Sequence, residues 1–70
     1  MVNSEIRING RSEPLVHATV ADLVAGKGVE PQGRGVAVAV NGQIVPRTAW
    51  PDTRLAPGDA VEIVRALKGG

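Results

Sequence analysis

Large apolar residues occupy every second position in three short stretches of the chain, and this period of two predicts β-strands. Residues 5–9 place two isoleucines between polar or charged neighbours, and residues 36–40 alternate valine with alanine. Residues 60–67 repeat the pattern, with Val61 and Ile63 on one face. Each strand is therefore expected to bury one face and expose the other.

Asn-Gly pairs at positions 9–10 and 41–42 follow the first two of these strands. This dipeptide favours the type I′ turn of a β-hairpin, because both central residues need a positive φ. We expect short return strands at residues 15–16 and 43–45. Pro14 indicates an edge strand, since proline cannot donate a hydrogen bond to a neighbouring strand.

One short helix is predicted between the two hairpins. Thr19 can cap its first turn, and Asp22 three residues later completes a weak capping-box pattern. The apolar stripe of this helix consists of Val20, Leu23 and Val24. Gly26 and Gly28 indicate its end, after about two to three turns.

The remaining segments are predicted to be connectors. A turn-rich connector is expected at residues 29–35, an irregular segment or short helical turn at residues 47–55, and a tight turn at residues 57–59. Trp50, the only aromatic residue, is expected to cover one end of the core.

The order of these elements predicts an α+β fold. Two hairpins cannot bury their apolar faces alone, and one amphipathic helix is available to cover them. If the first and last strands are central neighbours, they run parallel. This is the β-grasp arrangement of ubiquitin, a mixed sheet of about five strands on one main helix. We predict a single domain at residues 1–70, with residues 66–70 as a flexible tail.

The amino-acid composition argues against several classes of function. The chain has no cysteine and a single histidine, which argues against thiol chemistry and a dedicated transition-metal site. A net charge of +1 and one aromatic residue argue against nucleic-acid binding and strong attraction to anionic membranes. No run of about 18 apolar residues and no secretory pattern is present, so the expected location is the cytoplasm.

Two local motifs have residue types that occur in functional sites. The segment Gly26-Lys27-Gly28 follows a predicted helix instead of preceding one, so helix termination explains it better than phosphate binding. His17 and Asp22 could form an acid–base pair, but no nucleophile accompanies them. We therefore predict no catalytic residue, no metal ligand and no enzymatic activity for this chain.

The outward face of the predicted sheet is a candidate docking surface. Its members are Ala37, Ala39, Val64 and Ala66, all small or apolar. Such a face suits contact with a partner protein. The alternative is an apolar patch that a small protein merely tolerates.

The chain ends on Leu67, Lys68, Gly69 and Gly70. Glycine has no Cβ, so a diglycine arm can enter a narrow channel and present the Gly70 carboxylate to an enzyme. The alternative is a frayed terminus or a cloning remnant.

The chain resembles the ThiS-type sulfur carriers of thiamine-thiazole synthesis over nearly its whole length. The most specific parts are the segment NGQIVPRTAW at residues 41–50, the Gly58-Asp59 turn, and the final Gly69-Gly70. Molybdopterin sulfur carriers share the fold and the diglycine, but they usually lack the VPRxxW stretch and are richer in phenylalanine near the tail.

The resemblance implies a mechanism in which the body presents its tail to partner enzymes. A ThiF-like adenylating enzyme would use ATP to activate the Gly70 carboxylate. A persulfide sulfur donor would attack it, and hydrolysis or reduction would leave a thiocarboxylate for a thiazole synthase. Gly69 would permit the close approach, and residues 64–68 would form the strand end and arm. No cofactor is assigned to this chain, because the ATP belongs to its partner.

Three alternative functions remain open at this point. The chain could serve another sulfur pathway, such as molybdopterin, cysteine or thio-sugar synthesis. It could be a ubiquitin-like modifier whose Gly70 is joined to a target lysine. It could also be a binding module in which the glycines have no role.

Overall fold

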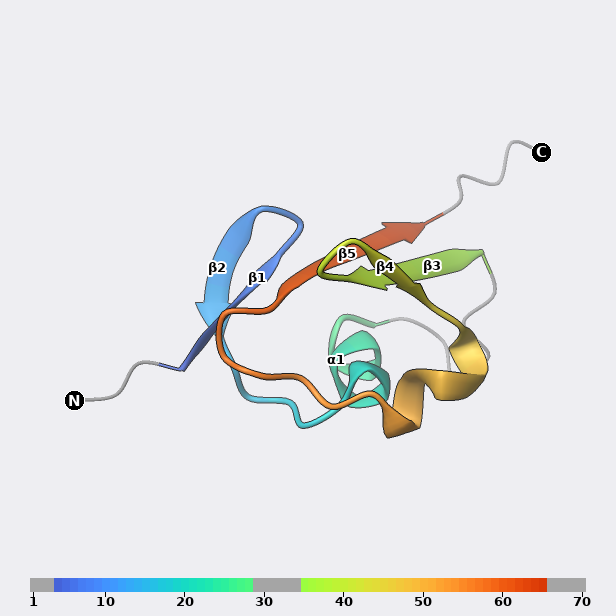
Figure 1. Ribbon diagram of the computed structural model, residues 1–70, viewed down its shortest axis with the longest axis horizontal. Coiled ribbons are helices and arrows are strands. Elements are labelled where there is room, and N and C mark those ends of the chain that lie inside the picture. Colours follow the sequence, from blue (N-terminus) through green and yellow to red (C-terminus); the bar gives the residue numbers. More distant parts are fainter. Residues whose placement is uncertain (1–3, 29–34, 66–70) are drawn as a thin grey trace.

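The computed structural model describes residues 4–28 and 35–65 of the 70-residue chain (Figure 1). Its elements are β1 (Glu5–Ile8), β2 (Arg11–Pro14), α1 (Val20–Gly26), β3 (Val36–Val40), β4 (Gln43–Val45), the 3₁₀ helix η1 (Arg47–Asp52) and β5 (Ala60–Arg65). The predicted tail at residues 66–70 and most of the predicted connector at residues 29–35 lie outside the described residues.

The strands form one mixed sheet in the order β2-β1-β5-β3-β4. β5 runs parallel to β1 and antiparallel to β3, while each hairpin pairs its own two strands antiparallel. α1 lies against one face of this sheet (Figure 1). The predicted mixed sheet around one helix, with the first and last strands as parallel neighbours, is confirmed.

Both predicted hairpin turns are present. Asn9 and Gly10 have φ of 54° and 83°, and Asn41 and Gly42 have φ of 52° and 84°. These positive values are those of a type I′ turn. The two-residue loops set the strand register, so pairing resumes immediately after each turn.

The predicted first return strand at residues 15–16 is wrong in its position. Because the turn has only two residues, Ile8 pairs with Arg11, and β2 ends at Pro14 opposite Glu5. Val16 lies beyond the strand, with an exposed fraction of 73%. β2 is an edge strand, as the proline predicted.

α1 begins and ends as predicted. The Thr19 side-chain oxygen accepts a hydrogen bond from the backbone N–H of Asp22 at 3.2 Å, which satisfies one free donor of the first turn. Beyond the last helical residue, Gly28 has a φ of 83°, a left-handed conformation that glycine adopts readily.

The core lies between α1 and the covered face of the sheet. Its buried residues are Ile6, Ile8, Val20, Leu23, Val24, Val38, Trp50 and Val61. Trp50 comes from η1 beside α1, and its indole N–H donates to the carbonyl of Val45 at 2.9 Å. The prediction that Trp50 covers the core is therefore confirmed, and η1 is the predicted short helical turn.

Candidate partner-docking surface

Successive residues of β5 face alternately the core and the opposite, outer side of the sheet. Val61 is buried and Ile63 packs against the core, whereas Glu62 and Val64 are exposed on the opposite face. This alternation follows from the strand period of two. The central strand therefore contributes both to the core and to the outer surface.

Strand register brings the predicted docking residues together. Ala37 pairs with Val64 across β3 and β5, and Ala39 pairs with Glu62 one step further along. Directly opposed residues on neighbouring strands share a face and lie within contact range. Three of the four predicted residues thus form one surface, and Ala66 lies outside the described residues.

Ile44, which was not among the predicted docking residues, belongs to the same surface. It pairs with Ala39 across β3 and β4, and its exposed fraction is 72%. The hairpin turn contained the signal for this placement. A two-residue loop at residues 41–42 puts Ile44 opposite Ala39 and therefore on the same face.

We call Ala37, Ala39, Ile44 and Val64 the outer patch. The two alanines keep its centre shallow, while Ile44 and Val64, with exposed fractions of 72% and 60%, stand on either side. These side chains offer no hydrogen-bond donor or acceptor. The surface is therefore suited to apolar contact with another protein, with the exposed Glu62 carboxylate beside it.

The strand that leads to the tail is held on both edges and at its end. The Asn9 side chain accepts a hydrogen bond from the Ile63 N–H at 2.8 Å and donates to the Ile63 carbonyl at 3.3 Å. The Arg65 guanidinium donates to the carbonyl of Lys27, just after α1, at 2.8 Å. On its other edge, β5 pairs with β3 over five residue pairs. The predicted tail residues Leu67, Lys68, Gly69 and Gly70 lie outside the described residues.

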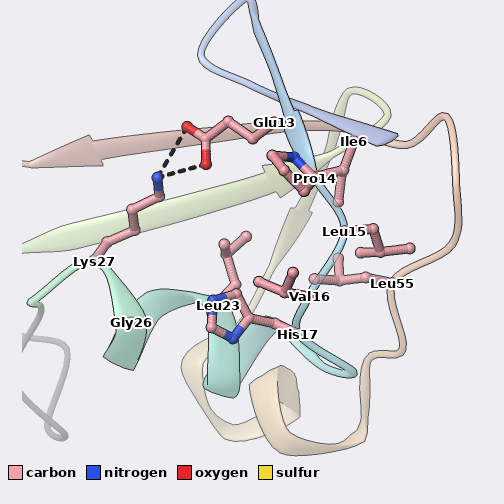
Figure 2. A pocket seen from close by; sticks show the side chains of 10 residues that line it. All are labelled: Ile6, Glu13, Pro14, Leu15, Val16, His17, Leu23, Gly26, Lys27 and Leu55. Carbon is pink, nitrogen blue, oxygen red and sulfur yellow. Dashed lines mark hydrogen bonds and ion pairs between the residues drawn. The ribbon is translucent and has the colours of Figure 1, made fainter. Parts of the chain in front are cut away.

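A small cavity between the end of β2 and α1 contains His17, one of the residues considered as a catalytic candidate (Figure 2). Its volume of about 70 Å³ is well below the several hundred Å³ of a typical ligand pocket. A Cβ built on Gly26 would lie 2.8 Å from two atoms of the His17 ring, so the imidazole packs directly on that backbone. Asp22 lies at the other end of the helix, in its first turn. The arrangement indicates a packing role for His17.

Within residues 4–28 and 35–65, no group of three or more potential metal-ligating side chains is found, and no helix is long and apolar enough to cross a membrane. Gly26, Lys27 and Gly28 form the end and cap of α1, as predicted.

A mixed five-stranded sheet on one helix, with parallel central strands from the two ends of the chain, defines a ubiquitin-like β-grasp protein. A crystal structure of the thiamine biosynthesis protein ThiS from Geobacter metallireducens matches it with a TM-score of 0.75 and 30% identity, covering 94% of this chain and 99% of that one. An NMR structure of a thiamine biosynthesis protein from the same organism gives a TM-score of 0.76 at 30% identity, covering 94% and 87%.

The sequence comparisons specify the family. The sulfur carrier protein ThiS of Thermus thermophilus is 36% identical over 63 residues, which covers 90% of this chain and 95% of the relative. The ThiS family model matches residues 6–70. The chain belongs to the ThiS family, which confirms the resemblance identified from the sequence.

Proposed function

We propose that this chain is the sulfur carrier protein of thiamine-thiazole synthesis. The observation that carries the proposal is the match of the ThiS family model over residues 6–70, which includes the Gly69-Gly70 pair. The name of the Thermus thermophilus relative and the fold of the Geobacter metallireducens protein support the same function. We expect the protein to act in the cytoplasm.

The chemistry takes place at the Gly70 carboxylate. An ionised carboxylate is a poor electrophile, so an adenylating enzyme of the ThiF type joins it to the AMP of ATP and releases pyrophosphate. The terminal sulfur of a donor persulfide then attacks the acyl carbon and displaces AMP. A thiol reductant cleaves the resulting S–S bond and leaves a thiocarboxylate, whose sulfur passes to a thiazole synthase.

In this proposal the chain presents its Gly70 carboxylate to the partner enzymes, and it supplies no acid, base or cofactor. The body is held rigid by the sheet, and a rigid body raises the effective concentration of the terminal group in a partner's active site. The bonds from Asn9 and Arg65 secure the strand end that precedes the arm, and Leu67 and Lys68 precede Gly69 in the sequence. The outer patch docks on the adenylating enzyme.

Intact-protein mass spectrometry tests the proposal. The chain is incubated with ATP, the adenylating enzyme and a sulfur source, and the expected product has sulfur in place of one oxygen within the C-terminal peptide. A variant that lacks Gly70 is the matched control, because the deletion removes the proposed acyl group and leaves residues 4–65 unchanged. Conversion of the deletion variant would contradict the assignment. High-mass conjugates in place of a free thiocarboxylate would indicate a protein modifier instead.

A further inference from the structure

A second surface lies on the helix side of β5, opposite the outer patch. It is a groove of about 440 Å³ whose apolar lining residues are Ile8 and Ile63. Its charged lining residues are Arg11, Glu13, Lys27 and Arg65. These residues come from both ends of the chain and from the end of α1, and the fold brings them together.

The described residues make the groove cationic, because only one of their three positive side chains faces a carboxylate within it. Lys27 pairs with Glu13, its ammonium nitrogen lying 2.7 and 2.9 Å from the two carboxylate oxygens (Figure 2). The Arg65 guanidinium donates to a backbone carbonyl, which does not neutralise its charge. Arg11 is exposed on the edge strand β2.

The groove carries a larger net positive charge than the chain as a whole. The three cations and one anion among its described lining residues give a net charge of +2 (3 − 1), whereas the whole chain carries +1. The remainder of the chain is therefore net negative by one charge (1 − 2). A local field of this kind orients an approaching acidic partner.

The groove also lies at the base of the predicted tail. Arg65 is the last residue of β5, and it shares the inward face with Ile63, while Val64 between them faces outward. The strand end that leads to residues 66–70 therefore has the cationic groove on one side and the apolar outer patch on the other.

We propose that the groove receives a carboxylate-bearing segment of the adenylating enzyme, so that the enzyme holds both faces of the end of β5. This inference rests on the proposed function. Guanidinium groups form paired, directional hydrogen bonds with carboxylates, and the groove presents two of them. Glu13 inside the groove and the near-neutral net charge disfavour a long polyanion such as nucleic acid.

The test compares the association rate constants of two charge-reversal variants with the adenylating enzyme. Arg11→Glu changes the groove, and Arg54→Glu is the matched control, because Arg54 is also exposed but lies beside Thr19, before α1. At low salt, Arg11→Glu is expected to slow association by about tenfold or more, and added salt is expected to shrink the difference. Arg54→Glu is expected to associate at nearly the wild-type rate.

A second variant probes the groove without reversing a charge. Arg65→Gln removes the positive charge and retains a shorter, neutral side chain with N–H donors. It is expected to slow association by a smaller factor than Arg11→Glu. Circular dichroism of all three variants establishes that they are folded.

The outcomes distinguish a failure of the groove proposal from a failure of the proposed function. If the wild-type chain is adenylated but Arg11→Glu and Arg54→Glu associate at the same rate, whether both are slowed or neither is, the groove proposal alone is overturned. If the wild-type chain is not adenylated, the proposed function fails and the groove proposal fails with it.

Discussion

The two faces of the sheet are made from the same strands but have different environments. On the covered face, Val38 and Val61 have exposed fractions of 0% and 1%. On the outer face, Ile44 and Val64 have exposed fractions of 72% and 60%. All four side chains are branched and apolar, so the difference in exposure comes from what packs against them. Apolar side chains stabilise the fold where α1 covers them, and they remain available for binding where nothing in the described chain does.

The largest expected effect is on the covered side, at Trp50. Trp50→Ala is expected to cost about 3–5 kcal/mol of unfolding free energy, because it removes the largest buried side chain and a hydrogen bond to Val45. A domain of this size has about that much stability in total, so the variant is expected to be largely unfolded by circular dichroism.

Trp50→Phe serves as the milder comparison. It keeps an aromatic ring and loses the indole N–H donor, so it is expected to remain folded with a loss of about 1 kcal/mol in urea unfolding. A fully stable Trp50→Ala variant would show that the ring does not cover the core.

The same substitution on opposite faces tests the comparison directly. Val38→Ala is expected to lower the unfolding free energy by about 2 kcal/mol, from two buried methyl groups at roughly 0.8 kcal/mol each and a cavity contribution. Val64→Ala is expected to change it by less than about 0.5 kcal/mol. Urea unfolding measures both, and equal losses would contradict the assignment of the two faces.

A charge on the outer patch is expected to weaken binding and leave the fold intact. Lysine suits position 39, because it would face Glu62 across the strands, whereas a glutamate would face a like charge. Ala39→Lys is expected to raise the dissociation constant for the adenylating enzyme by about tenfold or more, with unchanged thermal unfolding.

The matched control for that experiment is Ala25→Lys, which places the same charge on the exposed side of α1. Calorimetric titration of both variants gives the comparison. Equal affinities would mean that the outer patch is only a tolerated apolar surface.

A modest effect is expected at the cap of α1. Thr19→Ala is expected to cost about 1 kcal/mol, because the Asp22 N–H loses its side-chain acceptor. Thr19→Ser keeps the hydroxyl and is expected to stay near wild-type stability in the same urea unfolding experiment. If alanine and serine gave equal stability, the hydroxyl would have no capping role.

Several elements were predictable because their signals are local. The two Asn-Gly turns, the Thr19 cap and the end of α1 near Gly28 each depend on residues within one or two turns of chain. The alternation in residues 36–40 also predicted correctly that Ala37 and Ala39 lie on the outward face. The return strand after Gly10 was misplaced because the apolar residues after Pro14 were given more weight than the register set by a two-residue loop.

The amino-acid sequence by itself determined the elements, the fold class and the family resemblance, because periodicity, turn chemistry and short motifs are properties of neighbouring residues. Only the tertiary structure decided which distant residues meet. It placed Asn9 on the backbone of Ile63, 54 positions away, and gathered Arg11, Lys27 and Arg65 around one groove. Such meetings depend on strand order and register, which arise when the whole sheet closes over the helix.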